Sequence, residues 1–523
     1  MSSTAKSASK IMAAVMGSRV LGLVREMVLN AIFGAGKELD AFIAAFRFPN
    51  LLRDLFAEGA LSVSFVTTFS KKMETEGKEK AFRLASLVLS SLCIVMGVIT
   101  LVGIFGSEWL VKLITPGFYA TPGKAELTVQ LTQILFPFIF FVSLAAVYMG
   151  LLNSLGSFGL PASASTVFNA VSMVMGLGIG WWMDPHFGPK AIYGFAIGTV
   201  IGGIAQLVIQ IPRGAKLGYK PRWLLDWKDS GLKQVCILTL PAIVGGAAVQ
   251  VNVLVNTWFA SYLGDGAVTW LNNAFRLMQL PIGMFGVAVA TVTLPSVSRS
   301  AANENLGEFR DKVSEGLRLA LFLTVPASVG LAILAEPIIG TIYQRGAFTL
   351  FDTTQTAVAL QMYAIGLASY ACIKVIAPTF YALDAPKIPV RVSIIGIILN
   401  IILSFVFIRV LGLGIAGLPL STSLVALINV TELSFILRKK LGNFGNMPLF
   451  IAKLTTSALG MGICVHHLYK IWGQLCLTFS ARMFFLIVAI PVGVVIFGGL
   501  AWILQMKEMH SLLPFFKKST KTD

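Results

Sequence analysis

The stretch LASLVLSSLCIVMGVITLVGIFG, residues 84–106, contains no charged side chain. A helix needs about 20 apolar residues to cross the hydrocarbon core of a bilayer. A transmembrane β-strand needs only about ten residues, and its apolar and polar positions alternate with a period of two. Residues 84–106 are longer than such a strand and do not alternate, so they predict a membrane-spanning helix.

Apolar runs of similar length recur along all 523 residues, and they predict fourteen transmembrane helices. Hydrophobic residues make up 56% of the chain and charged residues 12%, with a mean hydropathy of +0.81, which leaves too little polar surface for a soluble protein. The expected spans are 11–34, 41–69, 84–106, 127–152, 160–182, 191–212, 234–263, 266–297, 317–334, 355–382, 388–408, 411–437, 448–469 and 481–505. We therefore expect an all-α polytopic membrane protein.

The distribution of basic residues predicts the orientation of the chain. With fourteen spans, both termini and every second loop lie on one side, which carries 27 of the 41 Lys and Arg residues, against 8 in the opposite loops. Basic loops remain in the cytoplasm. Both termini are therefore expected there, and the net charge of +17 requires no nucleic-acid partner. The remaining basic residues lie within or beside spans: Arg19, Arg25, Arg47, Arg53, Arg276 and Lys374.

Three short motifs recur at nearly one offset and predict an internal duplication. The pairs are Ala45-Phe46-Arg47 with Ala274-Phe275-Arg276, Ser70-Lys71 with Ser298-Arg299, and Leu160-Pro161 with Ile388-Pro389. A unit of six helices enters the membrane twice in the same direction, so the two copies are related by an axis along the membrane normal, as in some transporters. The predicted domains are 1–233 (spans 1–6 and a basic linker), 234–440 (spans 7–12) and 441–523 (spans 13 and 14 and a cytoplasmic tail).

The linker between the two predicted lobes, Pro212 to Lys233, mixes basic residues with Trp223 and Trp227. Tryptophan favours the headgroup region of a bilayer, and basic residues are attracted to the anionic lipids of the inner leaflet. The linker is therefore expected to form an interfacial helix on the cytoplasmic side.

The sequence SRVLGLVRE, residues 18–26, places charged side chains inside the first predicted span. Each Arg at mid-bilayer costs about 2.5 to 3.5 kcal/mol. Pairing within one helix would offset part of this cost, because residues seven apart lie on nearly one face. The candidate pairs are Arg19 with Glu26, and Arg47 with Asp40 and Asp54.

Two interpretations of the intramembrane charges remain open. Arginines can extend to the headgroups or bond neighbouring helices together. Alternatively, the arginines of spans 1 and 2, joined by Arg276 in span 8, line a water-filled cavity between the lobes that holds an anionic group. Arg suits phosphate, because its planar fork binds two oxygens and stays charged when desolvated. Lys374 could extend to the headgroups, line the second lobe's half of the cavity, or take part in coupling.

The segments SRVLGLVRE (18–26), FGAGKELDAFIAAFRFPNLLRDLFAEGALSVSFV (33–66) and AFRLMQLPIGMFGVAVATVTLPSVSR (274–299) closely resemble the MurJ (formerly MviN) family. This family comprises the lipid II flippases of the MOP exporter superfamily, and the resemblance covers nearly the whole chain. It implies two lobes, spans 1–6 and 7–12, that open alternately to either side of the bacterial inner (cytoplasmic) membrane. Spans 13 and 14 would form a groove for the polyprenyl tail. The implied role is in peptidoglycan biosynthesis, and hence in cell wall biogenesis and cell shape.

The resemblance also assigns site residues. The family's cavity arginines fall on Arg19, Arg25, Arg53 and Arg276, and its cavity acid falls on Asp40. Glu26 stands where relatives often have Asp, and Gln279 stands where some have Glu, which weakens any proton-handling role at position 279. Together with the charges found directly, the expected substrate-binding residues are Arg19, Arg25, Glu26, Asp40, Arg47, Arg53, Arg276 and Lys374.

No catalytic, cofactor or metal site is expected. The five cysteines show no metal or disulfide spacing, the four histidines lie away from the arginine cluster in sequence, and no Walker A loop is present. The expected partners are lipid II and membrane lipids, and a monomer is expected. The membrane potential, a proton or sodium could drive the cycle. Asn252, Asn256, Asn400 and Thr422 could bind sodium or serve only in helix packing.

Other functions remain open beside the transport of lipid II from the inner to the outer leaflet. A cation-linked multidrug exporter of the MOP type should place acids in its cavity, whereas this chain places arginines there. Charge alone does not distinguish an MOP-type flippase for another lipid-linked oligosaccharide, and the N-terminal motif favours lipid II. A membrane phosphatase or glycosyltransferase acting on a lipid-linked phosphate would be revealed by phosphate release or sugar transfer.

Overall fold

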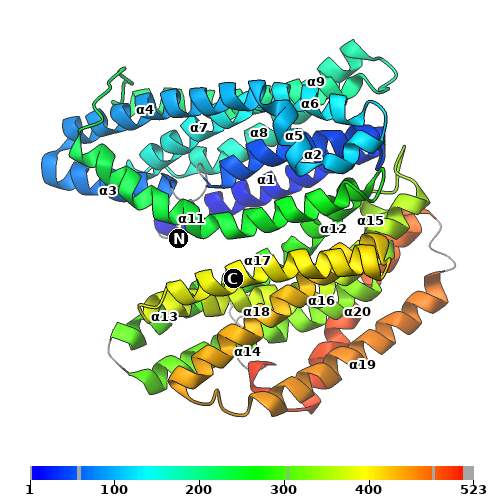
Figure 1. Cartoon of the computed structure of the whole chain (residues 1–523). Coiled ribbons are helices and arrows are strands. Elements are labelled where there is room, and N and C mark those ends of the chain that lie inside the picture. The colour runs from blue at the N-terminus through cyan, green and yellow to red at the C-terminus, as the bar shows by residue number, and fades with distance from the viewer. Residues whose placement is uncertain (1–2, 56–60, 303–304, 474–477, 510–523) are drawn as a thin grey trace. The chain divides into compact units, whose positions relative to one another are not determined.

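Two compact units make up the structure (Figure 1). The computed structural model describes residues 3–55, 61–302, 305–473 and 478–509, and these residues form helices and turns without a β-strand. Unit 1 consists of Met1–Thr269 with Arg345–Phe348, and unit 2 consists of Trp270–Gln344 with Thr349–Asp523. The expected all-α class is confirmed.

Most helices of unit 1 are long. Their bounds are α1 Ser3–Phe33, α2 Lys37–Leu52, α3 Leu61–Glu76, α4 Lys78–Phe105, α5 Ser107–Ile114, the 3₁₀-helix η2 Pro116–Ala120, α6 Lys124–Leu135, α7 Pro137–Ser154, α8 Gly159–Met183, α9 Ala191–Val208, α10 Ile211–Lys216 and α11 Ser230–Ala260. Helix α11 packs on α3, α4 and α5, so it belongs to unit 1 by contact. The lobe boundary at 233/234 stays a prediction.

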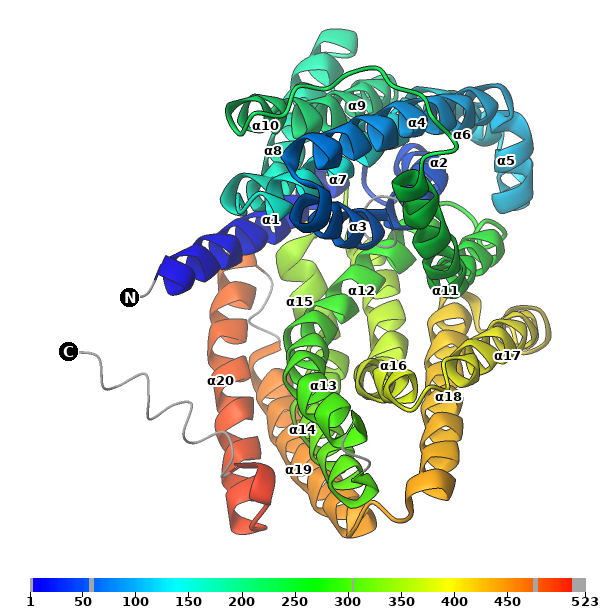
Figure 2. The same cartoon turned by 90° about the vertical axis from the view of Figure 1, so that its left-hand side faces the viewer.

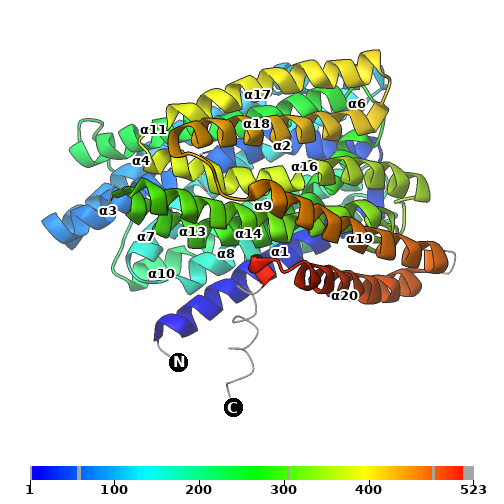
Figure 3. The ribbon, with the colours of Figure 1, turned by 90° about the horizontal axis from the view of Figure 1, so that it is seen from below.

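Helix α12, Ala267–Pro281, begins in unit 1 and continues into unit 2. The other elements of unit 2 are the π-helical η3 Ile282–Gly286, α13 Val287–Ala302, α14 Leu306–Ile333, α15 Ala335–Ile342, α16 Leu350–Ala382, α17 Lys387–Phe405, the π-helical η4 Val406–Val410, the 3₁₀-helix η5 Gly414–Ala416, α18 Gly417–Leu441, α19 Met447–Gly473 and α20 Phe479–Ile503. Figure 3 shows α19 and α20 side by side, and α19 packs on α14. The last two helices thus share the apolar core of unit 2, where the rings of Phe322 and Phe497 pack at a tilt with their centroids 5.1 Å apart.

Within the described residues, eleven helical segments are long and apolar enough to cross a membrane. The other three predicted spans correspond to α1, to α2 with α3, and to α11. Helices α1 and α2 carry the charges that the sequence predicts to lie in the membrane, and residues 56–60 between α2 and α3 lie outside the described part. The polytopic helical class is confirmed, whereas the count of fourteen stays a prediction.

The predicted duplication is visible in the element bounds. Helices α4 and α5 correspond to α14 and α15 at an offset of 228 residues at both ends of each helix. The irregular turns also correspond, because residues 53–55 are π-helical after α2 and residues 282–286 are π-helical within the matching α12–α13 segment. Each π turn follows the Ala-Phe-Arg motif of its own copy at the same spacing. Two copies of one helical unit therefore form the fold.

Helices α8 and α9 approach each other through small residues. A Cβ atom at Gly194 would lie 2.3 Å from the backbone N of Gly180, and one at Gly198 would lie 2.5 Å from the backbone N of Gly176. Glycines four apart on both helices let the backbones touch, and in a bilayer such packing replaces the hydrophobic effect as a source of helix association.

We expect Gly198→Val to destabilise unit 1 by about 2 to 3 kcal/mol, because the backbones of α8 and α9 must separate. Thermal unfolding of the purified protein in detergent measures this change. Gly178→Val is the matched control, because a Cβ atom there would meet nothing within 4 Å. Equal losses in the two variants would contradict the role given to the α8–α9 contact.

The interfacial helix predicted for residues 212–233 is wrong for most of that segment. Helix α10 covers only Ile211–Lys216, and residues 219–226 are non-helical. Gly218 has a φ of +94°, which interrupts a helix and favours glycine. Pro221 further disfavours the helical conformation in the residue before it.

Candidate functional site

Helix α1 carries three of the predicted site residues and packs on α8. The Arg25 guanidinium donates from Nη1 to Ser172 Oγ at 3.5 Å and lies 5.2 Å from the centroid of the Phe168 ring. Glu26 is buried, whereas Arg19 is exposed. Arg25 therefore faces the polar and aromatic side of α8, and the Arg19 side chain remains accessible.

Helix α2 and the π turn after it hold Asp40, Arg47 and Arg53. Arg53 Nη2 lies 3.0 Å from Asp54 Oδ1, and the other carboxylate oxygen of Asp54 accepts a 3.0 Å hydrogen bond from Gln250 Nε2 on α11. Asp54 thus bonds the adjacent arginine and α11, and the pairing predicted along the heptad stripe stays a prediction. Arg47 is half-buried at the middle of the same helical segment.

Two predicted site residues belong to unit 2. Arg276 is half-buried on α12, and Lys374 is exposed on α16. Asn400 and Thr422, named as possible sodium ligands, are buried on α17 and α18, where the Ser421 hydroxyl donates to Asn400 Oδ1 at 2.9 Å. Asn252 and Asn256 lie on α11 of unit 1. Each unit therefore contains some of the predicted cationic site residues.

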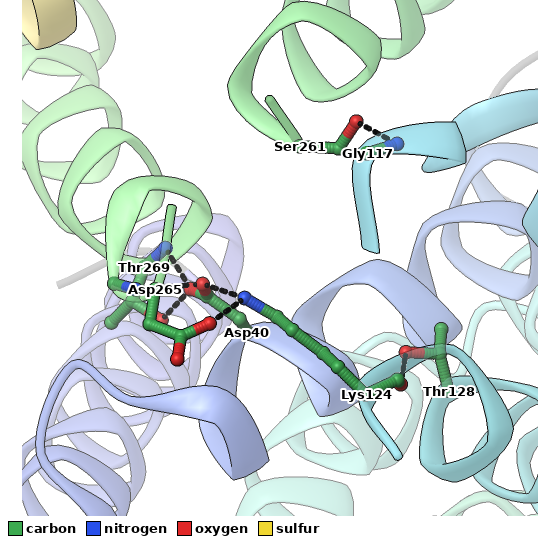
Figure 4. Close-up of polar contacts among 8 residues, drawn as sticks. Asp40, Gly117, Lys124, Thr128, Ser261, Asp265 and Thr269 are labelled. Carbon is green, nitrogen blue, oxygen red and sulfur yellow. Dashed lines mark hydrogen bonds and ion pairs between the residues drawn. The ribbon is translucent and has the colours of Figure 1, made fainter. Parts of the chain in front are cut away.

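Asp40 is the centre of a buried polar cluster in unit 1 (Figure 4). Its Oδ2 accepts from Lys124 Nζ at 2.8 Å and from the Gly266 N–H at 2.8 Å. Its Oδ1 accepts from the Thr269 N–H at 2.9 Å and from Thr269 Oγ1 at 2.7 Å. Asp40 is 0% exposed. We name these side chains, with Asp265, the Asp40 cluster.

Lys124 supplies the positive charge of the Asp40 cluster. Its ammonium donates to Asp40 and, at 2.7 Å, to Asp265 Oδ1, and it lies 4.1 Å from the centroid of the Phe118 ring. The residue is 1% exposed. The Asp40 carboxylate also accepts from the first turn of α12, where a helix presents its unpaired N–H groups and the positive end of its dipole. The cluster thus fastens the start of α12 to α2 and α6.

The second copy of the repeat has a related polar contact. Trp270 Nε1 on α12 donates to Asp352 Oδ1 on α16 at 3.0 Å, and Asp352 follows Lys124 by the repeat offset. Asp352 also forms a capping box with Thr349 at the start of α16. Both copies therefore join the same two helices at this end by a buried polar side chain.

Lys124 is the residue that sequence reasoning missed, because a lysine at the start of an apolar run predicts only a loop charge. Its one available signal is the repeat offset to Asp352, which pairs two charged residues in corresponding places. The substrate-binding role of Asp40 stays a prediction, and the structure shows that its carboxylate accepts four hydrogen bonds from Lys124, Gly266 and Thr269.

A duplicated bundle of apolar helices, with eleven described segments long enough to cross a membrane, indicates a polytopic membrane protein, and internal repeats of this kind are typical of transporters. A family model described as "Lipid II flippase MurJ" matches residues 29–498. The chain belongs to the lipid II flippase MurJ family.

Relatives with this name match most of the chain. A probable lipid II flippase MurJ of Vibrio cholerae is 36% identical and covers 82% of each chain, and one of Bdellovibrio bacteriovorus is 35% identical and covers 97% of this chain and 96% of its own. A lipid II flippase MurJ of Burkholderia cenocepacia is 34% identical over 86% of this chain and 87% of its own.

Solved structures agree with the family. One described as lipid II flippase MurJ in an inward closed conformation has a TM-score of 0.77 and 27% identity, covering 96% of this chain and 99% of the other. A multidrug transporter of the MATE family in the MOP superfamily has a TM-score of 0.67 at 13% identity, covering 84% and 99%, and this likeness shows the fold alone.

Proposed function

We propose that this chain moves lipid II from the inner to the outer leaflet of the bacterial cytoplasmic membrane, and so supplies peptidoglycan synthesis and cell wall growth. Three named relatives above 30% identity support this assignment. The observation that carries the chemistry is the Arg25 guanidinium, which lies beside the hydroxyl of Ser172 in the middle of α8, a helix long and apolar enough to cross a membrane.

The diphosphate of lipid II explains why arginines are kept inside the membrane. A diphosphate carries charges that cannot enter hydrocarbon unpaired, and guanidinium groups replace water around phosphate oxygens with paired hydrogen bonds. The polyprenyl tail is apolar and stays in the hydrocarbon of the bilayer, so its movement requires no transfer of apolar surface into water. Alternate opening of the two lobes then releases the bound headgroup on the other face, because the ligand shifts the balance between two conformations.

The proposed substrate-binding residues fall into two groups. Arg19, Arg25, Glu26, Arg47, Arg53, Arg276 and Lys374 are proposed to line the path of the headgroup. The Asp40 carboxylate accepts four hydrogen bonds. Asp40 is proposed to act by fixing the start of α12, and Arg276 lies on this helix.

The driving force, the orientation in the membrane and the oligomeric state are also part of the proposal. Membrane potential, a proton or sodium is proposed to reset the carrier, without a bound cofactor. Both termini are proposed to lie in the cytoplasm, in keeping with the excess of basic residues on that side. The working form is proposed to be a monomer.

Conditional depletion of this chain tests the function. We expect lipid II to accumulate in the inner leaflet and wall synthesis to stop, because a charged diphosphate headgroup crosses hydrocarbon very slowly without a carrier. Radiolabelled lipid precursors and incorporation of label into peptidoglycan measure the two effects. Accumulation of a different lipid-linked oligosaccharide would instead favour the related MOP-type flippases, and unchanged lipid II and wall synthesis would contradict the proposal.

A further inference from the structure

Residues 219–228, which we name the strap, lie along the first half of α4. The Arg222 N–H donates to Ser86 Oγ at 3.4 Å, and the Leu224 N–H donates to Ser90 Oγ at 3.1 Å. Ser90 Oγ also lies 3.4 Å from the Arg222 carbonyl oxygen, to which it donates. Two serines of one helix thus hold the backbone of the strap.

The spacing of these bonds shows how the strap runs. Four residues of α-helix rise about 6 Å, and two residues of extended chain span about 6.6 Å. Ser86 and Ser90 are four apart and bind Arg222 and Leu224, which are two apart, so the strap is extended and follows the axis of α4.

The strap lies close to the point at which the sequence of α4 changes from charged to apolar. The first six residues of α4, KEKAFR, hold four charged side chains, whereas the apolar sequence begins at Leu84. Ser86 and Ser90 stand just inside this apolar sequence. On a helix that crosses a bilayer, this is the level of the headgroups and the outermost acyl groups.

Both ends of the strap are fixed. Tyr219 is buried against Tyr148 and Phe82, with its hydroxyl 3.3 Å from Ser86 Oγ, and this burial raises the pKa of its phenol. Asp229 caps α11 by accepting from the N–H groups of Gly231 and Leu232. These contacts fix the position of the strap on unit 1, and with it the side chains on its outward face.

Aromatic and apolar side chains alternate along this outward face. Trp223 is 66% exposed, Leu225 46% and Trp227 53%. Alternate residues of an extended chain point to one side. Figure 2 shows the segment between α10 and α11 curving across the ends of α9 and α4 in unit 1. The three apolar side chains are thus exposed over about half of their surface or more.

Positive charge accompanies the apolar side chains. Lys220, Arg222 and Lys228 are exposed, whereas the carboxylates of the segment are engaged, Asp226 by Arg83 at 3.7 Å and Asp229 by the α11 cap. The strap therefore presents tryptophan with an excess of cationic groups. Exposed apolar side chains are unfavourable in water. At a bilayer surface, the tryptophans can enter the headgroup layer and the cationic groups can bind anionic lipid.

We propose that the strap is a lipid-binding site that seats Trp223, Leu225 and Trp227 in the headgroup layer and selects anionic phospholipids through Lys220, Arg222 and Lys228. The site is independent of the residues that handle lipid II. It would hold the ends of α4 and α11 at a fixed depth in the leaflet. Anionic lipid is the occupant because its charge complements the three cations.

Tryptophan quenching tests the seating of the strap in the full chain, reconstituted into bilayers of phosphatidylcholine with phosphatidylglycerol. The fluorescence of the strap is the difference between the wild type and the Trp223→Phe/Trp227→Phe variant. This subtraction cancels the fluorescence of the other tryptophans. We expect lipids brominated near the headgroup to quench this signal and aqueous acrylamide to quench it weakly. Full quenching by acrylamide without quenching by brominated lipid would overturn the proposal.

A second experiment tests the selection of anionic lipid. Brominated phosphatidylglycerol is diluted into phosphatidylcholine, and its quenching reports enrichment at the strap. In Lys220→Gln/Arg222→Gln/Lys228→Gln we expect this enrichment to fall about tenfold. The matched control, Arg438→Gln/Lys439→Gln/Lys440→Gln, removes three exposed charges at the end of α18 and should leave it unchanged. Equal effects of the two variants, or none from the first, would overturn the selection.

Discussion

Arg25→Ala is expected to abolish transport of lipid II while the protein remains folded in the membrane. Truncation removes a guanidinium that is held against Ser172 and Phe168 and is proposed to bind the diphosphate. Loss of one charge-assisted contact to a desolvated anion costs about 2 to 5 kcal/mol, which corresponds to about a thirtyfold or greater loss of binding. Complementation of a strain depleted of its lipid II flippase measures the effect, and immunoblotting of membranes measures abundance.

Two further variants sharpen this prediction. Arg276→Ala on α12 is expected to fail in the same way, because the second copy of the repeat is proposed to supply cations to the same headgroup. Arg310→Ala serves as the control, since Arg310 is a surface residue paired with Asp311 outside the proposed path. Normal growth with Arg25→Ala at wild-type abundance would contradict the binding role, whereas loss of the protein from the membrane would assign Arg25 to folding.

Lys124→Met is expected to lower the stability of the protein by about 3 to 5 kcal/mol, because it leaves the Asp40 carboxylate buried without its cation. Asp40 would keep the donors of Gly266 and Thr269, but hydrogen bonds alone do not neutralise a charge that is fully enclosed. Thermal unfolding of the purified protein in detergent measures the loss.

Comparison variants separate the charge from the side chain. Lys112→Met on α5 removes an exposed lysine from the same unit and should change stability by less than about 0.5 kcal/mol. Asp40→Asn combined with Lys124→Met removes both charges and should recover part of the loss. If the double variant were less stable than Lys124→Met by the full effect of Asp40→Asn alone, the two residues would not be coupled and the Asp40 cluster would not act as a charged unit.

The helical architecture was predictable because the bilayer imposes its length on the sequence. Residues 84–106 could only be a spanning helix, and the structure continues that helix outward to Lys78 through its charged first turn. The repeat was predictable from Ala45-Phe46-Arg47 and Ala274-Phe275-Arg276, because duplicated helices that pack alike keep their residues at one offset. The family followed from the same motifs and is confirmed by the match over residues 29–498.

Contacts between distant segments were not predictable in this way. Lys124 is bonded to Asp40 and Asp265, and no spacing along one helix links these positions. The strap was expected as a helix because its composition suits one at an interface. The serines of α4 and the conformations of Gly218 and Pro221 override that preference. The length of an apolar helix can thus be predicted from composition, whereas the partners of its polar side chains depend on the packing of the whole bundle.

The most direct test of the central claim measures lipid II from outside the cell. Cells that depend on this chain are treated with a membrane-impermeant enzyme that cleaves lipid II, and the cleaved fraction reports lipid II in the outer leaflet. The account predicts substantial cleavage with the wild type, and background cleavage with Arg25→Ala despite a larger total pool of lipid II. Equal cleavage in both strains would contradict transport of the diphosphate by intramembrane arginine.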